Sequence, residues 1–190
     1  MEKDVRIHLL ARVARSVSAP DRQLDPAKPV SILSLTAASY GARPSEDATV
    51  PTGFDPLAVA LFEAIVEGAY LVAAADGVFD DEERRTFEKV VLAACGGSVA
   101  QEQIAALVSD LGDQLEEDGI DKRVAAVART ATKKEHAQEV LRIAALLAQA
   151  SDDVSGVEKD VLGKLAKACN LDASEVDAAM ADVKKALSAG

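Results

Sequence analysis

The sequence predicts an all-α protein, and three features of its 190 residues support that fold class. Hydrophobic residues make up 49% of the chain but aromatic residues only 3%, so most apolar residues are Ala, Leu and Val. Ala and Leu favour helix, and small side chains let helices pack closely. All six prolines, which interrupt helices, lie between Pro20 and Pro56. Beyond them, a helical pattern occurs twice. We therefore expect a bundle of about seven to eight helices.

Residues 3–17 form the first predicted helix, with Val5, Leu9, Val13 and Val17 at a spacing of four residues. Its arginines fall on other faces. Such a basic amphipathic helix can bind a membrane surface or an acidic partner. It can also dock on its own domain, and the lack of Trp and Phe on the apolar face favours that interpretation.

The stretch from Ser18 to Pro56 contains every proline and is predicted to be an extended arm, with one helical turn within residues 30–41. Residues 1–56 are thus an N-terminal amphipathic helix and arm, and residues 57–190 are the helical domain. An arm of this kind could wrap around a second copy of the chain and make a homodimer.

The helical domain begins with a run of helices separated by short polar loops. Asp76-Gly77 ends the first helix, because Gly accepts the left-handed conformation that follows many helices. Asp80 is a predicted N-cap, and Glu83 three residues later completes a capping box. The predicted helices of this half cover residues 57–75, 81–95 and 99–116, followed by a connector helix over residues 121–133.

The pattern then repeats, because Glu83 and Glu158 lie 75 residues apart and their neighbouring apolar positions correspond. At the same offset, Asp80 corresponds to Ser155, which is another good N-cap. The sequence therefore predicts a duplicated three-helix unit, with copies at about residues 57–116 and 134–188. Neither copy could bury its apolar face alone, so we expect the two to pack about a pseudo-twofold axis.

The formal net charge of −11 limits the classes of partner. Nucleic acid and anionic membranes both attract basic proteins, so neither is expected as a partner. No segment resembles a signal peptide or an uninterrupted membrane span of about 20 residues. We therefore expect a cytoplasmic protein without direct membrane insertion, whose partners are cations or basic patches on other proteins.

The segment AYLVAAADGVFDDEERRTFEKVV, residues 69–91, resembles the signature of the TerB-like family of tellurite-resistance proteins. Its second copy, AALLAQASDDVSGVEKDVLGKLAKAC, resembles the repeat half of that family, although Ser151-Asp152 replaces the family's Asp-Gly. The resemblance covers about residues 57–188. It implies a helical bundle with acidic clusters that bind divalent metal, acting in membrane-associated stress complexes.

The acidic loop of residues 76–83 has two physical interpretations. Its spacing is not that of an EF-hand, but Asp76, Asp80 and Glu83 could form a weak site for Ca²⁺ or Mg²⁺, which prefer carboxylate oxygens. Asp152 and Glu158 would form a weaker copy of that site. Alternatively, these acids only cap and separate helices.

No catalytic constellation is visible in the sequence. Cys95 and Cys169 are expected to be apolar packing residues, and His8 and His136 are isolated from other metal ligands or nucleophiles. We therefore predict a non-enzymatic binding or adaptor protein of the stress-response type. The alternatives are a structural interaction module without metal, and an enzyme that uses a metal bound in the acidic pocket as a Lewis acid.

Overall fold

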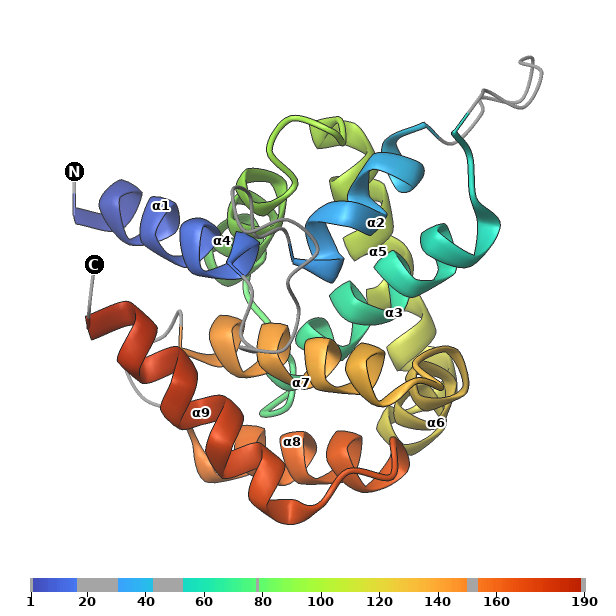
Figure 1. The fold of residues 1–190 in the computed structure, drawn as a ribbon, viewed down its shortest axis with the longest axis vertical. Helices are drawn as coiled ribbons and strands as arrows, with labels where there is room; N and C mark the ends of the chain where they lie inside the picture. Colours follow the sequence, from blue (N-terminus) through green and yellow to red (C-terminus); the bar gives the residue numbers. More distant parts are fainter. Residues whose placement is uncertain (1, 17–30, 43–52, 78, 150–153, 189–190) are drawn as a thin grey trace.

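The computed structural model describes residues 2–16, 31–42, 53–77, 79–149 and 154–188. In these residues the chain forms nine helices and no strand, which confirms the all-α class (Figure 1). The helices are α1 (Glu2–Arg15), α2 (Ile32–Gly41), α3 (Pro56–Ala73), α4 (Asp81–Ala94), α5 (Gln101–Asp118), α6 (Ile120–Thr130), α7 (Lys134–Ala148), α8 (Gly156–Ala168) and α9 (Ala173–Ser188).

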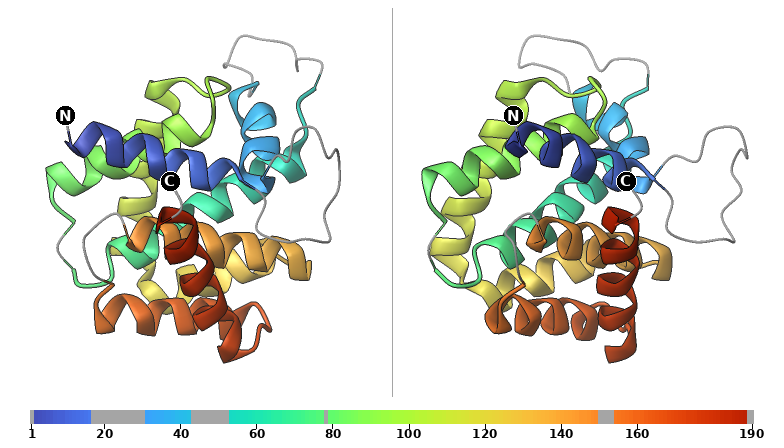
Figure 2. Two further views of the ribbon diagram at one scale, coloured as in Figure 1. Left: turned by 60° about the vertical axis from the view of Figure 1, so that its left-hand side comes forward. Right: turned by 90° about the vertical axis from the view of Figure 1, so that its left-hand side faces the viewer.

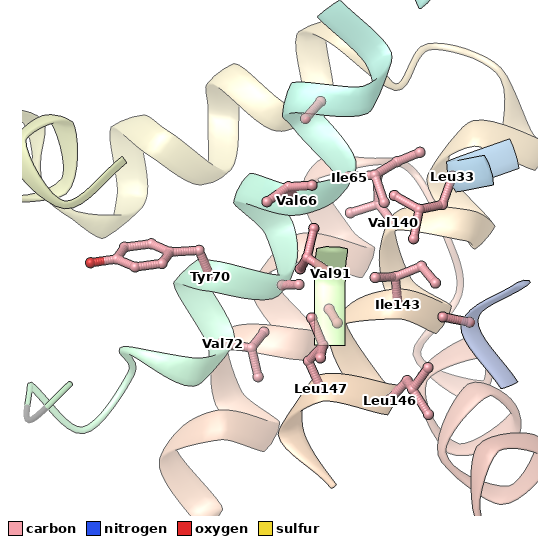
Figure 3. Close-up of a cluster of buried hydrophobic side chains, with 14 of the residues drawn as sticks. Leu33, Ile65, Val66, Tyr70, Val72, Val91, Val140, Ile143, Leu146 and Leu147 are labelled. Atoms are coloured by element: carbon pink, nitrogen blue, oxygen red, sulfur yellow. The ribbon is translucent and has the colours of Figure 1, made fainter. Parts of the chain in front are cut away.

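Helices α3 and α7 form the centre of the molecule and make the most extensive contact between any two described helices. Every residue of α7 from Glu139 to Ala148 is buried. Figure 3 shows side chains of both helices meeting in one cluster, with Leu33 of α2 and Val91 of α4 beside them. The remaining helices surround this pair.

Among the described helices, α3 is long and apolar enough to cross a membrane by length and composition alone. The helix contains Glu63 and Glu67, so it is not an uninterrupted apolar run of about 20 residues, which the sequence was expected to lack. In addition, 67% of the 18-residue helix is buried inside the protein, and any helix at the centre of a protein core passes the same test. The length and composition of α3 are therefore weak support for a membrane span, and its burial is that of a central core helix.

The duplication expected from the sequence is present in the structure. Helix α4 begins at Asp81 and α8 at Gly156, 75 residues later, and each follows a complete capping box. Helices α3 and α7 end 75 residues apart as well, at Ala73 and Ala148. The predicted connector is α6, which begins and ends a little earlier than expected.

The contacts add a fourth helix to each unit. Helix α6 packs against α8, α3 and α5, and α1 packs against α4, α7 and α9. Because α4 corresponds to α8, α3 to α7 and α5 to α9, these two sets of contacts are equivalent. Helix α1 thus stands in the first unit where α6 stands in the second. Helix α2 has no counterpart and is an addition to the first unit.

Helix α1 docks on its own domain, as expected, but its buried face differs from the predicted one. The buried side chains are Leu10, Ala11, Val13 and Ala14, whereas Val5 is 65% exposed. A spacing of four residues advances 400° around a helix, so Val5 and Val13 drift about 80° apart and cannot share one narrow face. Figure 2 shows α1 lying near the C-terminal helix α9, which it contacts.

The helical turn that the sequence predicts within residues 30–41 of the arm is a longer helix in the structure. Ser31 caps a ten-residue helix there, and Leu33, Ala37 and Tyr40 are buried. The Tyr40 and Phe62 rings lie 4.6 Å apart, which fixes α2 against α3. Burial against α3 stabilises a helix that its local sequence supports weakly. Residues 17–30 and 43–52 lie outside the described residues, so wrapping of the arm around a second copy stays a prediction.

Gly68 marks the closest approach of α3 and α7. A Cβ atom at this position would lie 2.6 Å from Cγ1 of Val140, so Gly68→Ala should overpack the crossing and lower the free energy of unfolding by about 1–3 kcal/mol. Gly163→Ala is the matched control: nothing lies near its Cβ, and it should stabilise α8 by about 0.4–1 kcal/mol. Urea unfolding of both variants measures the difference. Equal stability of the two variants would contradict a close crossing at Gly68.

Candidate functional site

The candidate site is the loop that joins α3 to α4. The backbone N–H of Gly77 donates to the carbonyl of Ala74 at 3.1 Å, and Gly77 has a φ of 80°. This left-handed conformation favours Gly, as the sequence indicated. Asp76 is exposed directly before Gly77, and Val78 lies outside the described residues.

Asp80 and Glu83 form the predicted capping box at the start of α4. Oδ1 of Asp80 accepts hydrogen bonds from the backbone N–H groups of Glu82 and Glu83, at 2.8 and 2.9 Å. Oε2 of Glu83 accepts from the N–H of Asp80 at 3.0 Å. Asp81 and Glu82 lie in the same first turn, where negative charge is stabilised by the helix dipole. The helix-capping interpretation is therefore confirmed for Asp80 and Glu83.

The equivalent loop of the second unit uses the same device. Oγ of Ser155 accepts from the N–H of Glu158 at 3.2 Å, and Oε2 of Glu158 accepts from the N–H of Ser155 at 2.7 Å. Asp152, the other residue of the predicted second cation site, lies outside the described residues. Only the capping role of Glu158 is thus observed.

The described residues contain no group of three or more His, Cys, Asp or Glu side chains arranged to hold a metal ion. The structure brings Asp80 together with Glu83, but Asp76 does not join them in such a group. Ca²⁺ takes six to eight oxygen ligands, so water would have to supply most of them here. Cation binding at this loop stays a prediction.

Two buried ion pairs are the main polar features that the sequence did not reveal. In the second unit, Nε of Arg123 on α6 lies 2.6 Å from Oε1 of Glu67, which is only 7% exposed on α3. Arg123 also contacts Asp118 at 3.1 Å. The hydrogen bond to Glu67 raises the pKa of Arg123 above its ordinary value, so the guanidinium stays charged. It fastens α6 to α3.

The other buried pair fastens α1 and α2 to α7. The guanidinium of Arg142 contacts both carboxylate oxygens of Glu139, at 2.8 and 3.0 Å. It also donates to the backbone carbonyls of Val13 and Ala14, at 3.0 and 2.8 Å. Oε1 of Glu139 accepts from the N–H of Leu33 at 3.1 Å. The end of α1 and the start of α2 are therefore held by one pair of charges.

Glu67 and Arg142 occupy equivalent positions of the two units, 75 residues apart. Each is a buried charged residue within a central helix, and each anchors the flanking helix of a unit. A charged residue inside a largely apolar helix was the available sequence signal. Arg142 has Glu139 three residues away. Arg123, in contrast, lies 56 residues from Glu67, and the carbonyls that Arg142 reaches on α1 lie more than a hundred residues away.

A groove of about 730 Å³ runs between α8 and α9. Lysines line it on the α8 side and aspartates on the α9 side, above a partly apolar floor; the lining includes Lys159, Lys167, Asp172, Asp177, Val176 and Met180. None of the lining residues is His or Cys. The groove thus offers ion-pairing and apolar contacts, and its lining contains neither a thiol nor an imidazole.

The two cysteines behave as packing residues, as expected. Cys95 is buried in the core, and burial raises the pKa of its thiol to about 12. Cys169 is partly buried, and burial raises its pKa as well. Both thiols are free and remain protonated at neutral pH, so neither is an activated nucleophile.

This geometry defines an acidic helical protein built from two related units around a pair of buried helices. A family model described as tellurite resistance protein TerB matches residues 62–181. Because the match covers more than half of the chain, the chain belongs to the TerB family. Helices α1 and α2 precede the matched range. A comparison with curated proteins gives no match, and a comparison with solved structures gives none either.

Removing either N-cap should destabilise the protein by similar amounts. We expect Asp80→Ala and Ser155→Ala each to lower the free energy of unfolding by about 0.5–2 kcal/mol, because the first turn of α4 or α8 loses a hydrogen-bond acceptor. Asp160→Ala, which removes an exposed acid within α8, is the control and should change stability little. Thermal and urea unfolding give the values. A cap variant as stable as the control would show that the capping box is unimportant.

Proposed function

We propose that this TerB-family chain is a non-enzymatic binding or adaptor protein of the tellurite-resistance and stress-response type, acting in the cytoplasm. The observation that carries the proposal is the exposed acidic loop and helix start at residues 76–83, in a chain with a net charge of −11. A negative surface of this kind attracts cations and basic protein surfaces.

We infer weak binding of Ca²⁺ or Mg²⁺ by Asp76, Asp80 and Glu83, with Asp152 and Glu158 as a weaker second site. Capping uses one oxygen of Asp80 and one of Glu83, and a carboxylate can accept from more than one partner. The capped geometry also holds both carboxylates at one end of α4. With few protein ligands, the expected dissociation constant is about 10⁻⁵ to 10⁻³ M.

The partners that fit this surface are other proteins, such as members of a membrane-associated stress complex. The acidic charge disfavours nucleic acid and anionic lipid, and the role requires no direct insertion into a membrane. The cation would lower the repulsion between the acids and so adjust the affinity for a basic partner surface.

A second candidate is a structural interaction module that binds no metal. The observation that favours it is the completeness of both capping boxes, which alone accounts for Asp80, Glu83 and Glu158. It does not account for Asp76. Homodimerisation through the N-terminal arm belongs to this candidate, and light scattering on the full chain measures it.

Isothermal titration with Ca²⁺ and Mg²⁺ tests the cation site. Wild type should bind with a dissociation constant of about 10⁻⁵ to 10⁻³ M, and Asp76→Asn should weaken binding because one charged ligand is lost. Asp160→Asn is the matched control: it removes one negative charge from an exposed position of α8 without touching the loop.

Equal weakening by Asp76→Asn and Asp160→Asn would indicate a general charge effect and no site. Wild type that gives neither heat nor a shift in melting temperature at millimolar cation would favour the structural module. Asp76→Asn removes no capping group, so it leaves both capping boxes intact and separates the two candidates.

A further inference from the structure

Helix α1 lies on the TerB domain but outside the matched family range. It packs against α4, α7 and α9, and residues 17–30 join it to α2. The end of α1 and the start of α2 lie side by side, because the N–H of Ser31 donates to the carbonyl of Arg15 at 3.2 Å. Helices α4, α7 and α9 therefore form the surface on which α1 lies, and residues 17–30 connect α1 to the rest of the chain.

The surface under α1 recognises a short apolar helix and its end. The buried side chains of α1 are Leu10, Ala11, Val13 and Ala14, and two of these are alanines that allow close approach. Ile7 and Leu9 are partly buried and also pack against the core. At the end of the helix, the 4%-exposed Arg142 donates to the carbonyls of Val13 and Ala14. The last carbonyls of any helix lack partners within the helix, so Arg142 satisfies a need that every helix end has.

The comparison with α6 shows why this contact differs from an ordinary core contact. Helix α6 is fastened by its own side chain, Arg123, which pairs with Glu67. At the equivalent position of the other unit, Arg142 pairs with Glu139 on its own helix and offers its outer N–H groups to backbone atoms of α1. The anchor for α6 depends on one side chain of α6, but the anchor for α1 requires only backbone carbonyls.

The rest of α1 adds a polar contact to the docking. Arg12 and Arg15 are exposed, and Arg6 donates to the backbone carbonyl of Gln149 at 2.9 Å. Docking therefore uses an apolar face, a helix end and the Arg6 contact. An amphipathic helix of another protein can supply an apolar face and a helix end.

We propose that α4, α7 and α9 form a helix-docking site that α1 fills in the free chain, and that an amphipathic helix of a partner protein binds there in place of α1. Such a helix has small and aliphatic residues in the pattern of Leu10, Ala11, Val13 and Ala14, and it ends where Arg142 can donate hydrogen bonds to its last carbonyls. The proposal rests on the adaptor role and names the kind of partner, but it requires no cation. A titration that shows no cation binding would therefore count against the cation site alone, and a failed helix exchange would count against the helix-docking site alone.

Exchange of α1 in the full chain tests the proposal. A protease recognition sequence placed within residues 17–30 allows the connection to be cut after folding, so that α1 stays on the domain without a covalent link. A fluorescent peptide of residues 2–16 is the probe. We expect the labelled peptide to replace the resident helix, with saturable binding in fluorescence polarisation and release of the unlabelled fragment seen by mass spectrometry.

Matched variants show whether binding uses the proposed contacts. A peptide with Leu10→Asp should not compete, whereas a peptide with Arg12→Ala, changed on the exposed side, should bind as well as the unchanged peptide. In the protein, Glu139→Gln combined with Arg142→Met removes the donors without leaving one buried charge unpaired. This double variant should bind the peptide roughly ten- to a hundredfold more weakly, as expected for loss of charged hydrogen bonds.

Three results would overturn the proposal. A cut chain that stays folded and keeps its α1 fragment without exchange would make α1 a permanent part of the core. A cut chain that unfolds would do the same. Dimers formed by exchange of α1 between uncut copies, seen by light scattering, would assign the site to a second copy of this chain instead of to a partner protein.

Discussion

The crossing of α3 and α7 is the constraint on which the rest of the structure depends. Both helices are buried over most of their length, so each requires other helices to cover its apolar side chains. Gly68 lets them approach closely, and the pair then presents outer faces that the flanking helices cover. The arrangement of two related units follows, because two similar central helices impose similar requirements on their neighbours.

The central helices carry buried charges, and these decide where the flanking helices lie. An unpaired charge in a protein interior is very unfavourable, so Glu67 and Arg142 need partners close by. Glu67 obtains Arg123 of α6, and Arg142 obtains Glu139 together with the end of α1. The buried charges at these equivalent positions thus contact their flanking helices differently. Glu67 pairs with a side chain of α6, whereas Arg142, already paired with Glu139, donates to backbone carbonyls of α1.

Local features were predictable from the sequence and long-range ones were not. The caps at Asp80 and Ser155 depend on residues three positions apart. The sequence repeat predicted the order of the helices. The docking of α2 on Glu139 and the hydrogen bonds from Arg142 to α1 depend on contacts across more than a hundred residues, which no local pattern contains. At the candidate site, capping by Glu83 was predictable from the sequence. The position of Asp76 relative to Asp80 and Glu83 was not, because it depends on the path of the loop.

Hydrogen exchange measured residue by residue tests the central crossing most directly. If α3 and α7 stabilise each other, the amides at their centres should be the slowest in the protein and should open with one common free energy, that of global unfolding. Helix α1, held by a small apolar face and one polar anchor, should open at a lower free energy. Amides of α3 that open well before those of α7, or α1 amides as protected as both, would contradict this account.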